Sequence, residues 1–137
     1  MDHYEHPHNK RVPSDERYQK INMDSTSCID NIDVFLLVED GKVVDCCFDG
    51  VGCTISTAST SMMTDLVIGE SIERARYIIE QYQNMIHEKE FDEEALGDTI
   101  VFANTYKQAA RIRCATIGWR GLTHLLDDAE GKPHEEE

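Results

Sequence analysis

The chain has 137 residues, of which 27 are acidic and 13 are basic, and its formal net charge at pH 7 is −14. A phosphate backbone would be repelled by this charge, so nucleic acid is not an expected partner. The length suits one domain, and a hydrophobic content of 40% excludes a wholly disordered chain. No apolar run reaches the roughly 18 residues of a membrane span, and the polar first residues are unlike a signal peptide. We therefore expect a cytoplasmic protein with no membrane partner.

The first part of the chain predicts β-strands. Residues 32–38 and 43–48 are rich in β-branched and aromatic side chains, and the turn-forming residues 39–42 separate them, which is typical of a β-hairpin. Residues 17–23 are a candidate third strand, because two strands alone are only marginally stable in water.

The apolar spacing changes after Cys53. Apolar residues recur every three or four positions over residues 55–66 and again over residues 72–86, which predicts two amphipathic helices. Gly69 would end the first of them, and Ser71 can cap the amino end of the second.

The last part of the chain predicts further helices. Residues 91–106, which Gly97 interrupts, predict one or two short helices, and residues 112–126 predict a final amphipathic helix. Strands followed by helices indicate an α+β fold, in which a small antiparallel three-stranded sheet is followed by several helices packed on it. We expect one domain over residues 1–126 and an acidic, disordered tail over residues 127–137.

Five cysteines form an odd set that does not suit the disulfide framework of a small secreted domain. Cys53 lies at the predicted strand-to-helix turn, where the amino end of a helix stabilises a thiolate. Cys114 lies beside two arginines, and Cys28 forms a Cys-x-Asp pair with Asp30. Zinc takes four ligands of these types, so these four side chains could share one site. Unrelated buried thiols are the alternative that spacing alone leaves open.

The other cysteines and the amino-terminal histidines favour no site. Cys46 and Cys47 are adjacent in a predicted strand and face opposite sides, which predicts one core thiol and one surface thiol. His3, His6 and His8 could bind a metal, but their polar segment favours a solvated arm.

Three sequence blocks together resemble a known family. They are Asp2-His3-Tyr4 with Pro7 and Asn9, the run from Phe48 to Ser56 with Ala58, Ser59, Met62 and Met63, and Arg111-Ile112-Arg113-Cys114-Ala115-Thr116. On these blocks the chain resembles the U-type iron–sulfur cluster assembly family, which includes IscU, SufU and the NifU amino-terminal domain. The family's three ligand cysteines correspond to Cys28, Cys53 and Cys114.

Two features distinguish the branches of this family. IscU-like scaffolds carry a histidine immediately before the last ligand cysteine, and they have a short stretch between the second and third ligand cysteines. Here Arg113 precedes Cys114, and residues 91–106 lengthen the stretch between Cys53 and Cys114. The chain is therefore similar to the SufU branch. This resemblance implies a zinc-dependent sulfurtransferase that accepts persulfide sulfur from a pyridoxal-phosphate-dependent cysteine desulfurase of the SufS type, and that works with downstream iron–sulfur assembly proteins rather than as a stand-alone enzyme.

The resemblance also implies a role for each site residue. Zn²⁺ would be bound by Cys28, Asp30, Cys53 and Cys114. Cys28 would accept the persulfide sulfur, and Arg111 would lie beside the metal site.

Two other interpretations stay open. The same ligands could assemble and transfer a [2Fe–2S] cluster, since such clusters also favour cysteine thiolates. Alternatively, the zinc could be purely structural, because Ile29 stands where the family has a glycine between Cys28 and Asp30. A β-branched residue resists backbone angles that glycine permits.

Overall fold

A three-stranded antiparallel sheet opens the fold, and the structure, a computed structural model, describes residues 6–24, 30–103 and 109–130. The strands are β1 (Gln19–Asp24), β2 (Asn31–Glu39) and β3 (Lys42–Val51), and they lie in the order β1-β2-β3. Both the predicted hairpin and the third strand are thus confirmed. Asp40 and Gly41 join β2 to β3 with positive φ angles of 53° and 74°, which match the right-handed twist of a tight hairpin.

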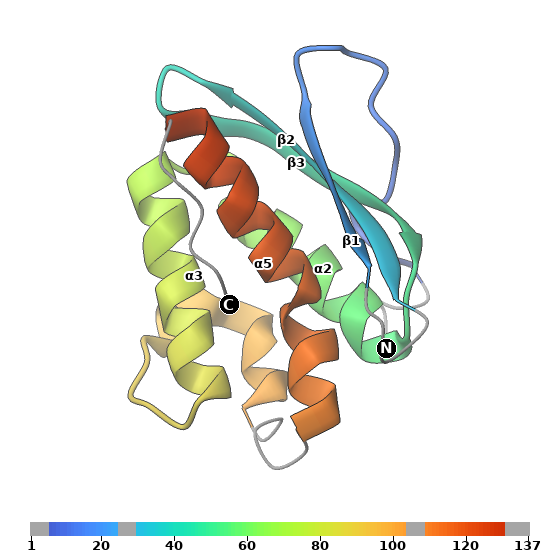
Figure 1. The fold of residues 1–137 in the computed structure, drawn as a ribbon. Helices are drawn as coiled ribbons and strands as arrows, with labels where there is room; N and C mark the ends of the chain where they lie inside the picture. Colours follow the sequence, from blue (N-terminus) through green and yellow to red (C-terminus); the bar gives the residue numbers. More distant parts are fainter. Residues whose placement is uncertain (1–5, 25–29, 104–108, 131–137) are drawn as a thin grey trace.

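The helices follow in the order α2 (Thr54–Val67), α3 (Ile72–Ile86), α4 (Glu93–Leu96), η1 (Gly97–Phe102) and α5 (Ala109–Glu130). They cover one face of the sheet, with α5 lying across it (Figure 1). The predicted α+β fold is therefore confirmed. Ser71 caps α3 as expected, since its side chain accepts a hydrogen bond from the Arg74 N–H at 3.0 Å. Within the described residues no helix combines the length and apolar composition that crossing a bilayer requires.

The final helix extends further than its apolar spacing predicts. It ends at Glu130 rather than at residue 126, so Asp127 is helical, and it accepts a hydrogen bond from Arg76 of α3 at 2.9 Å. This ion pair, whose side chains are only 28% and 14% exposed, holds the end of α5 against α3. The remainder of the predicted tail, residues 131–137, lies outside the described residues.

The core lies between the sheet and the helices. Ile32, Val34 and Leu36 alternate along β2 and are at most 1% exposed, as the two-residue period of a strand requires. The contact between α2 and α5 is especially close, because a Cβ atom at Gly118 would lie 2.4 Å from Oγ1 of Thr60. Small residues on these helices therefore let the two backbones approach each other.

The prediction of one core thiol and one surface thiol in β3 is wrong, since Cys46 and Cys47 are both 0% exposed. Cys46 belongs to the main core. Cys47 lies on the other face of the sheet, where the positive charge of Arg11 acts on it. The segment that carries Arg11 is fastened to the edge of β3 by backbone hydrogen bonds between Phe48 and residues 9 and 11. Burial raises the pKa of both thiols, so they remain protonated at neutral pH.

Asp45 ties the amino-terminal segment to the sheet. The Arg11 guanidinium donates to both of its carboxylate oxygens at 2.9 Å, and the Tyr18 hydroxyl donates to it as well. Burial alone would raise the pKa of the Asp45 carboxyl, but the hydrogen bonds from Arg11 and Tyr18 outweigh burial and hold this pKa below its ordinary value. The bond to Asp45 also raises the pKa of Tyr18 to about 12, so its hydroxyl stays protonated and donating at physiological pH.

We expect Asp45→Asn to lower the free energy of unfolding at pH 7 by about 1 kcal/mol, a modest loss because the Arg11 side chain is 45% exposed. Because the pKa of the Asp45 carboxyl is lower in the folded than in the unfolded chain, its charge stabilises the fold at pH values above the pKa of the unfolded chain. This stabilisation is lost as the pH falls through the pKa of the folded protein. The difference between the two proteins should therefore shrink below about pH 4. Urea unfolding at pH 7, 5 and 3 measures it, with Glu80→Gln, at an exposed position of α3, as the control. If the wild type and Asp45→Asn differed in unfolding free energy by the same amount at all three pH values, the Asp45 charge would not stabilise the fold.

Candidate metal centre

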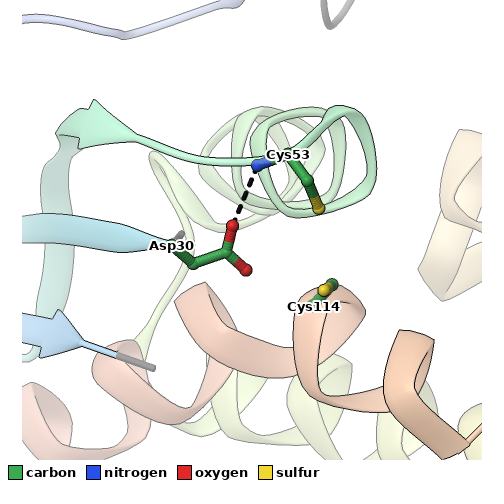
Figure 2. Close-up of side chains that lie close together, drawn as sticks. All are labelled: Asp30, Cys53 and Cys114. Atoms are coloured by element: carbon green, nitrogen blue, oxygen red, sulfur yellow. Dashed lines mark hydrogen bonds between the residues drawn. The ribbon is translucent and has the colours of Figure 1, made fainter. Parts of the chain in front are cut away.

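Three predicted ligands meet at one end of the sheet. Asp30 immediately precedes β2, Cys53 is the N-cap of α2, and Cys114 lies in the second turn of α5. One potential ligand atom from each, an oxygen or a sulfur, lies within 4.8 Å of the other two. Figure 2 shows the three side chains converging from these separate elements.

Asp30 is a buried carboxylate with only 1% of its surface exposed. Its Oδ1 accepts hydrogen bonds from the Cys53 N–H and from the Ser56 hydroxyl, both at 2.9 Å. These bonds offset part of the cost of burying a charge. They also fix the orientation of the carboxyl group, so that its second oxygen is directed to the side on which both cysteine sulfurs lie (Figure 2).

Cys53 is held where the chain turns from β3 into α2. Its Sγ accepts the Ser56 N–H at 3.4 Å, which makes the sulfur the capping group of the helix. The end of β3 that leads into this turn requires glycine at position 50, because φ there is +122° and a Cβ atom would lie 2.2 Å from the carbonyl oxygen of Asn31.

The donor set fits a thiophilic divalent metal. Two thiolates and a carboxylate are ligands that zinc accepts, with bonds of about 2.0–2.3 Å and therefore about 3.3–3.8 Å between ligand atoms in a tetrahedron. Ligand atoms that already lie within 4.8 Å of one another would need to close by at most about 1.5 Å to reach that spacing. Rotation about side-chain bonds of the two partly exposed cysteines can supply such a movement.

The predicted site residues fare differently in the structure. The structure brings the side chains of Asp30, Cys53 and Cys114 together, and their role as metal ligands stays a prediction. Cys28 lies outside the described residues. Arg111 belongs to α5, three positions before Cys114, but its side chain also lies outside the described part of the chain. The roles of these residues in metal binding or sulfur transfer stay predictions.

Ser56 is a site residue that the sequence reasoning did not single out. It hydrogen-bonds to both Asp30 and Cys53 and is 0% exposed. Its signal in the sequence is the spacing Cys53-x-x-Ser56, because a residue three positions after an N-cap can bond back to the capping residue.

The sequence is similar to those of known proteins over most of its length. The family model described as the NifU-like N terminal domain matches residues 1–115. Over 132 residues, which cover 96% of this chain and 88% of the relative, the chain is 37% identical to the zinc-dependent sulfurtransferase SufU of Bacillus subtilis. It is 38% identical over 100 residues to the iron–sulfur cluster assembly scaffold protein IscU of Thermotoga maritima, covering 73% of this chain and 70% of the relative.

Solved structures share the fold as well. The crystal structure of FiSufU from Fervidobacterium islandicum superposes with a TM-score of 0.76 at 30% identity, covering 92% of this chain and 88% of that one. A second crystal structure, of a hypothetical protein, gives a TM-score of 0.84 at 33% identity and covers 92% of both chains. The chain therefore belongs to the family of NifU-like N-terminal domains, a family of iron–sulfur cluster assembly proteins.

Proposed function

We propose that this protein is a zinc-dependent sulfur acceptor, in which Cys28 takes persulfide sulfur from a cysteine desulfurase. The observation that carries the proposal is the convergence of Asp30, Cys53 and Cys114 within 4.8 Å. The identity to a zinc-dependent sulfurtransferase over 96% of the chain supports it. In this proposal Cys28 is the fourth ligand, and residues 1–126 form the single functional domain.

The transfer step is an exchange between two sulfur compounds. The Cys28 thiolate attacks the outer sulfur of the desulfurase persulfide, and a new S–S bond forms on Cys28. The old S–S bond breaks, and its electron pair leaves with the desulfurase cysteine as a thiolate. No external oxidant or reductant is needed, because one persulfide replaces another. Bound zinc would supply one effect, which is to keep its cysteine ligands deprotonated at neutral pH.

The remaining site residues hold this arrangement in place. Ser56 anchors the Asp30 carboxylate and the Cys53 sulfur through its hydroxyl and its backbone N–H. Three thiolates and one carboxylate carry four negative charges, of which a divalent cation neutralises two. We assign Arg111, one turn before Cys114 on α5, to offset part of the remaining charge.

A [2Fe–2S] scaffold is the second candidate. Its specific support is the identity of 38% to an assembly scaffold protein over 73% of the chain, together with a thiolate-rich donor set that iron–sulfur clusters also favour. Arg113, in place of the histidine of IscU-like scaffolds, favours the sulfur acceptor.

Metal analysis combined with a desulfurase assay tests the proposal. We expect about one zinc per chain and a colourless protein after purification both in air and without oxygen. The wild-type protein should accelerate a pyridoxal-phosphate-dependent desulfurase of the SufS type and accept labelled sulfur, whereas Cys28→Ser should do neither. Cys47→Ser, which changes a thiol on the far face of the sheet, is the matched control and should keep both activities. Iron with sulfide and visible absorption would establish the scaffold instead, and zinc without any acceleration would leave a structural site.

A further inference from the structure

A buried hydrogen-bond cluster includes Ala115, the residue that follows Cys114 in α5. We call it the Ala115 cluster, and it consists of Ser59, Tyr82, Ala115 and Trp119. The Ser59 hydroxyl donates to the Ala115 carbonyl oxygen at 2.6 Å and accepts the Trp119 indole N–H at 3.0 Å. The Tyr82 hydroxyl donates to the same carbonyl oxygen at 2.6 Å and lies 3.0 Å from the Ser59 oxygen.

The cluster is shielded from solvent and closely packed. Its members are at most 1% exposed, and the rings of Tyr82 and Trp119 stack with centroids 3.9 Å apart and an interplanar angle of 5°. Burial raises the pKa of Tyr82, so its hydroxyl stays protonated and remains a donor. In a low-dielectric interior, hydrogen bonds of this kind are strong and leave few alternative arrangements.

The cluster connects three helices at a point close to the metal centre. Ser59 belongs to α2, Tyr82 to α3, and Ala115 and Trp119 to α5. Ala115 is the residue after Cys114. Ser59 lies six positions after Cys53, which is about 9 Å along a helix.

Two independent contacts therefore define how α5 sits on α2. The close approach of Gly118 to Thr60 sets the distance between the helices, and the bonds to the Ala115 carbonyl set the rotation of α5 about its axis. Because the Cys114 side chain projects from α5 toward Cys53 (Figure 2), a rotation of α5 about its axis would swing the Cys114 sulfur away from the Cys53 sulfur.

We propose that Ser59 and Tyr82 are positioning residues for the metal centre, which act through the Ala115 carbonyl to hold the Cys114 sulfur beside the Cys53 sulfur. This inference rests on the proposed function for the identity of the metal, but the positioning itself concerns this chain's own two sulfurs. A merely structural cluster would contribute to folding stability and leave the geometry of the centre unchanged.

Tyr82→Phe is the decisive variant, since it removes one hydroxyl and keeps the ring that stacks on Trp119. Tyr77→Phe is its matched control, because Tyr77 also lies on α3 and also loses a hydroxyl bond, to Asp92, but at the surface. We expect Tyr82→Phe to fold, by far-UV circular dichroism, and to bind zinc about tenfold more weakly in competition with a chelator, at the lower end of the effects seen for groups behind a metal ligand. The visible spectrum of the cobalt-substituted protein should change in Tyr82→Phe and not in Tyr77→Phe.

A metal-free measurement separates this inference from the proposed function. After chelation, mild oxidation with diamide should join Cys53 to Cys114, and peptide mapping follows the rate. We expect this disulfide to form several-fold more slowly in Tyr82→Phe than in the wild type and in Tyr77→Phe. An unchanged rate, together with unchanged zinc affinity and cobalt spectrum, would overturn the positioning role. If the wild type bound no metal but the rates still differed, the proposed function would fail while the positioning of the two sulfurs stood.

Discussion

Replacing Trp119 with alanine is expected to lower the free energy of unfolding by about 4 kcal/mol, which is within the range for removing a buried aromatic side chain. The indole is 0% exposed and stacks on Tyr82, and its N–H is bonded to Ser59. The substitution therefore leaves both a cavity and a disrupted polar cluster where three helices meet. For a domain of this size the loss corresponds to a fall in melting temperature of roughly 15 °C.

Urea unfolding followed by far-UV circular dichroism measures this effect, because the chain has a single tryptophan and the variant loses its fluorescence. Trp119→Phe keeps the ring stack but not the N–H, so it should lose less than half as much. Val44→Ala removes a β3 side chain that is 45% exposed and should change the stability little. A Trp119→Ala protein as stable as the wild type would show that the helices are held together elsewhere.

Removing zinc is expected to have a similarly large effect. The proposed ligands belong to segments far apart in the chain, so a bound ion links the end of the sheet to α2 and α5. A ligand that binds only the folded state stabilises it by about 4 kcal/mol when its free concentration is a thousand times the dissociation constant. We therefore expect the melting temperature to fall by about 10 °C or more after chelation, with metal loss verified by elemental analysis.

Cys114→Ala is the control for this experiment. It should be purified with little zinc, melt at a lower temperature than the wild type, and show no further change on chelation, because the site is already broken. An unchanged melting curve in the wild type after verified metal loss would mean that the hydrophobic core holds these segments without a metal.

Most elements of the fold could be predicted from local patterns. The β-rich runs on either side of Asp40-Gly41 predict the hairpin, and the three- and four-residue spacing predicts helices near their observed ranges. The apolar spacing predicts that α5 ends at residue 126, too early, because Asp127 carries a charge. Its partner, Arg76, lies on another helix, and no local pattern of α5 reveals it.

The candidate site was predictable in part, from residue types and family resemblance rather than from periodicity. Residue types, local context and the resemblance to a family indicate Asp30, Cys53 and Cys114 as ligands, and the structure brings their ligand atoms together. Ser56 was not singled out, because its role depends on a carboxylate from a distant segment.

The sequence by itself determined the α+β order, the hairpin, the helix caps and the residue types of the candidate metal ligands, because these depend on neighbours in the chain. Only the tertiary structure decided that Cys47 is buried, that Ser56 bonds to Asp30, and that the Ala115 carbonyl next to Cys114 accepts two hydroxyl groups. Each of these features joins residues from separate elements. Such contacts are set by how the helices pack on the sheet, which periodicity within one element does not encode.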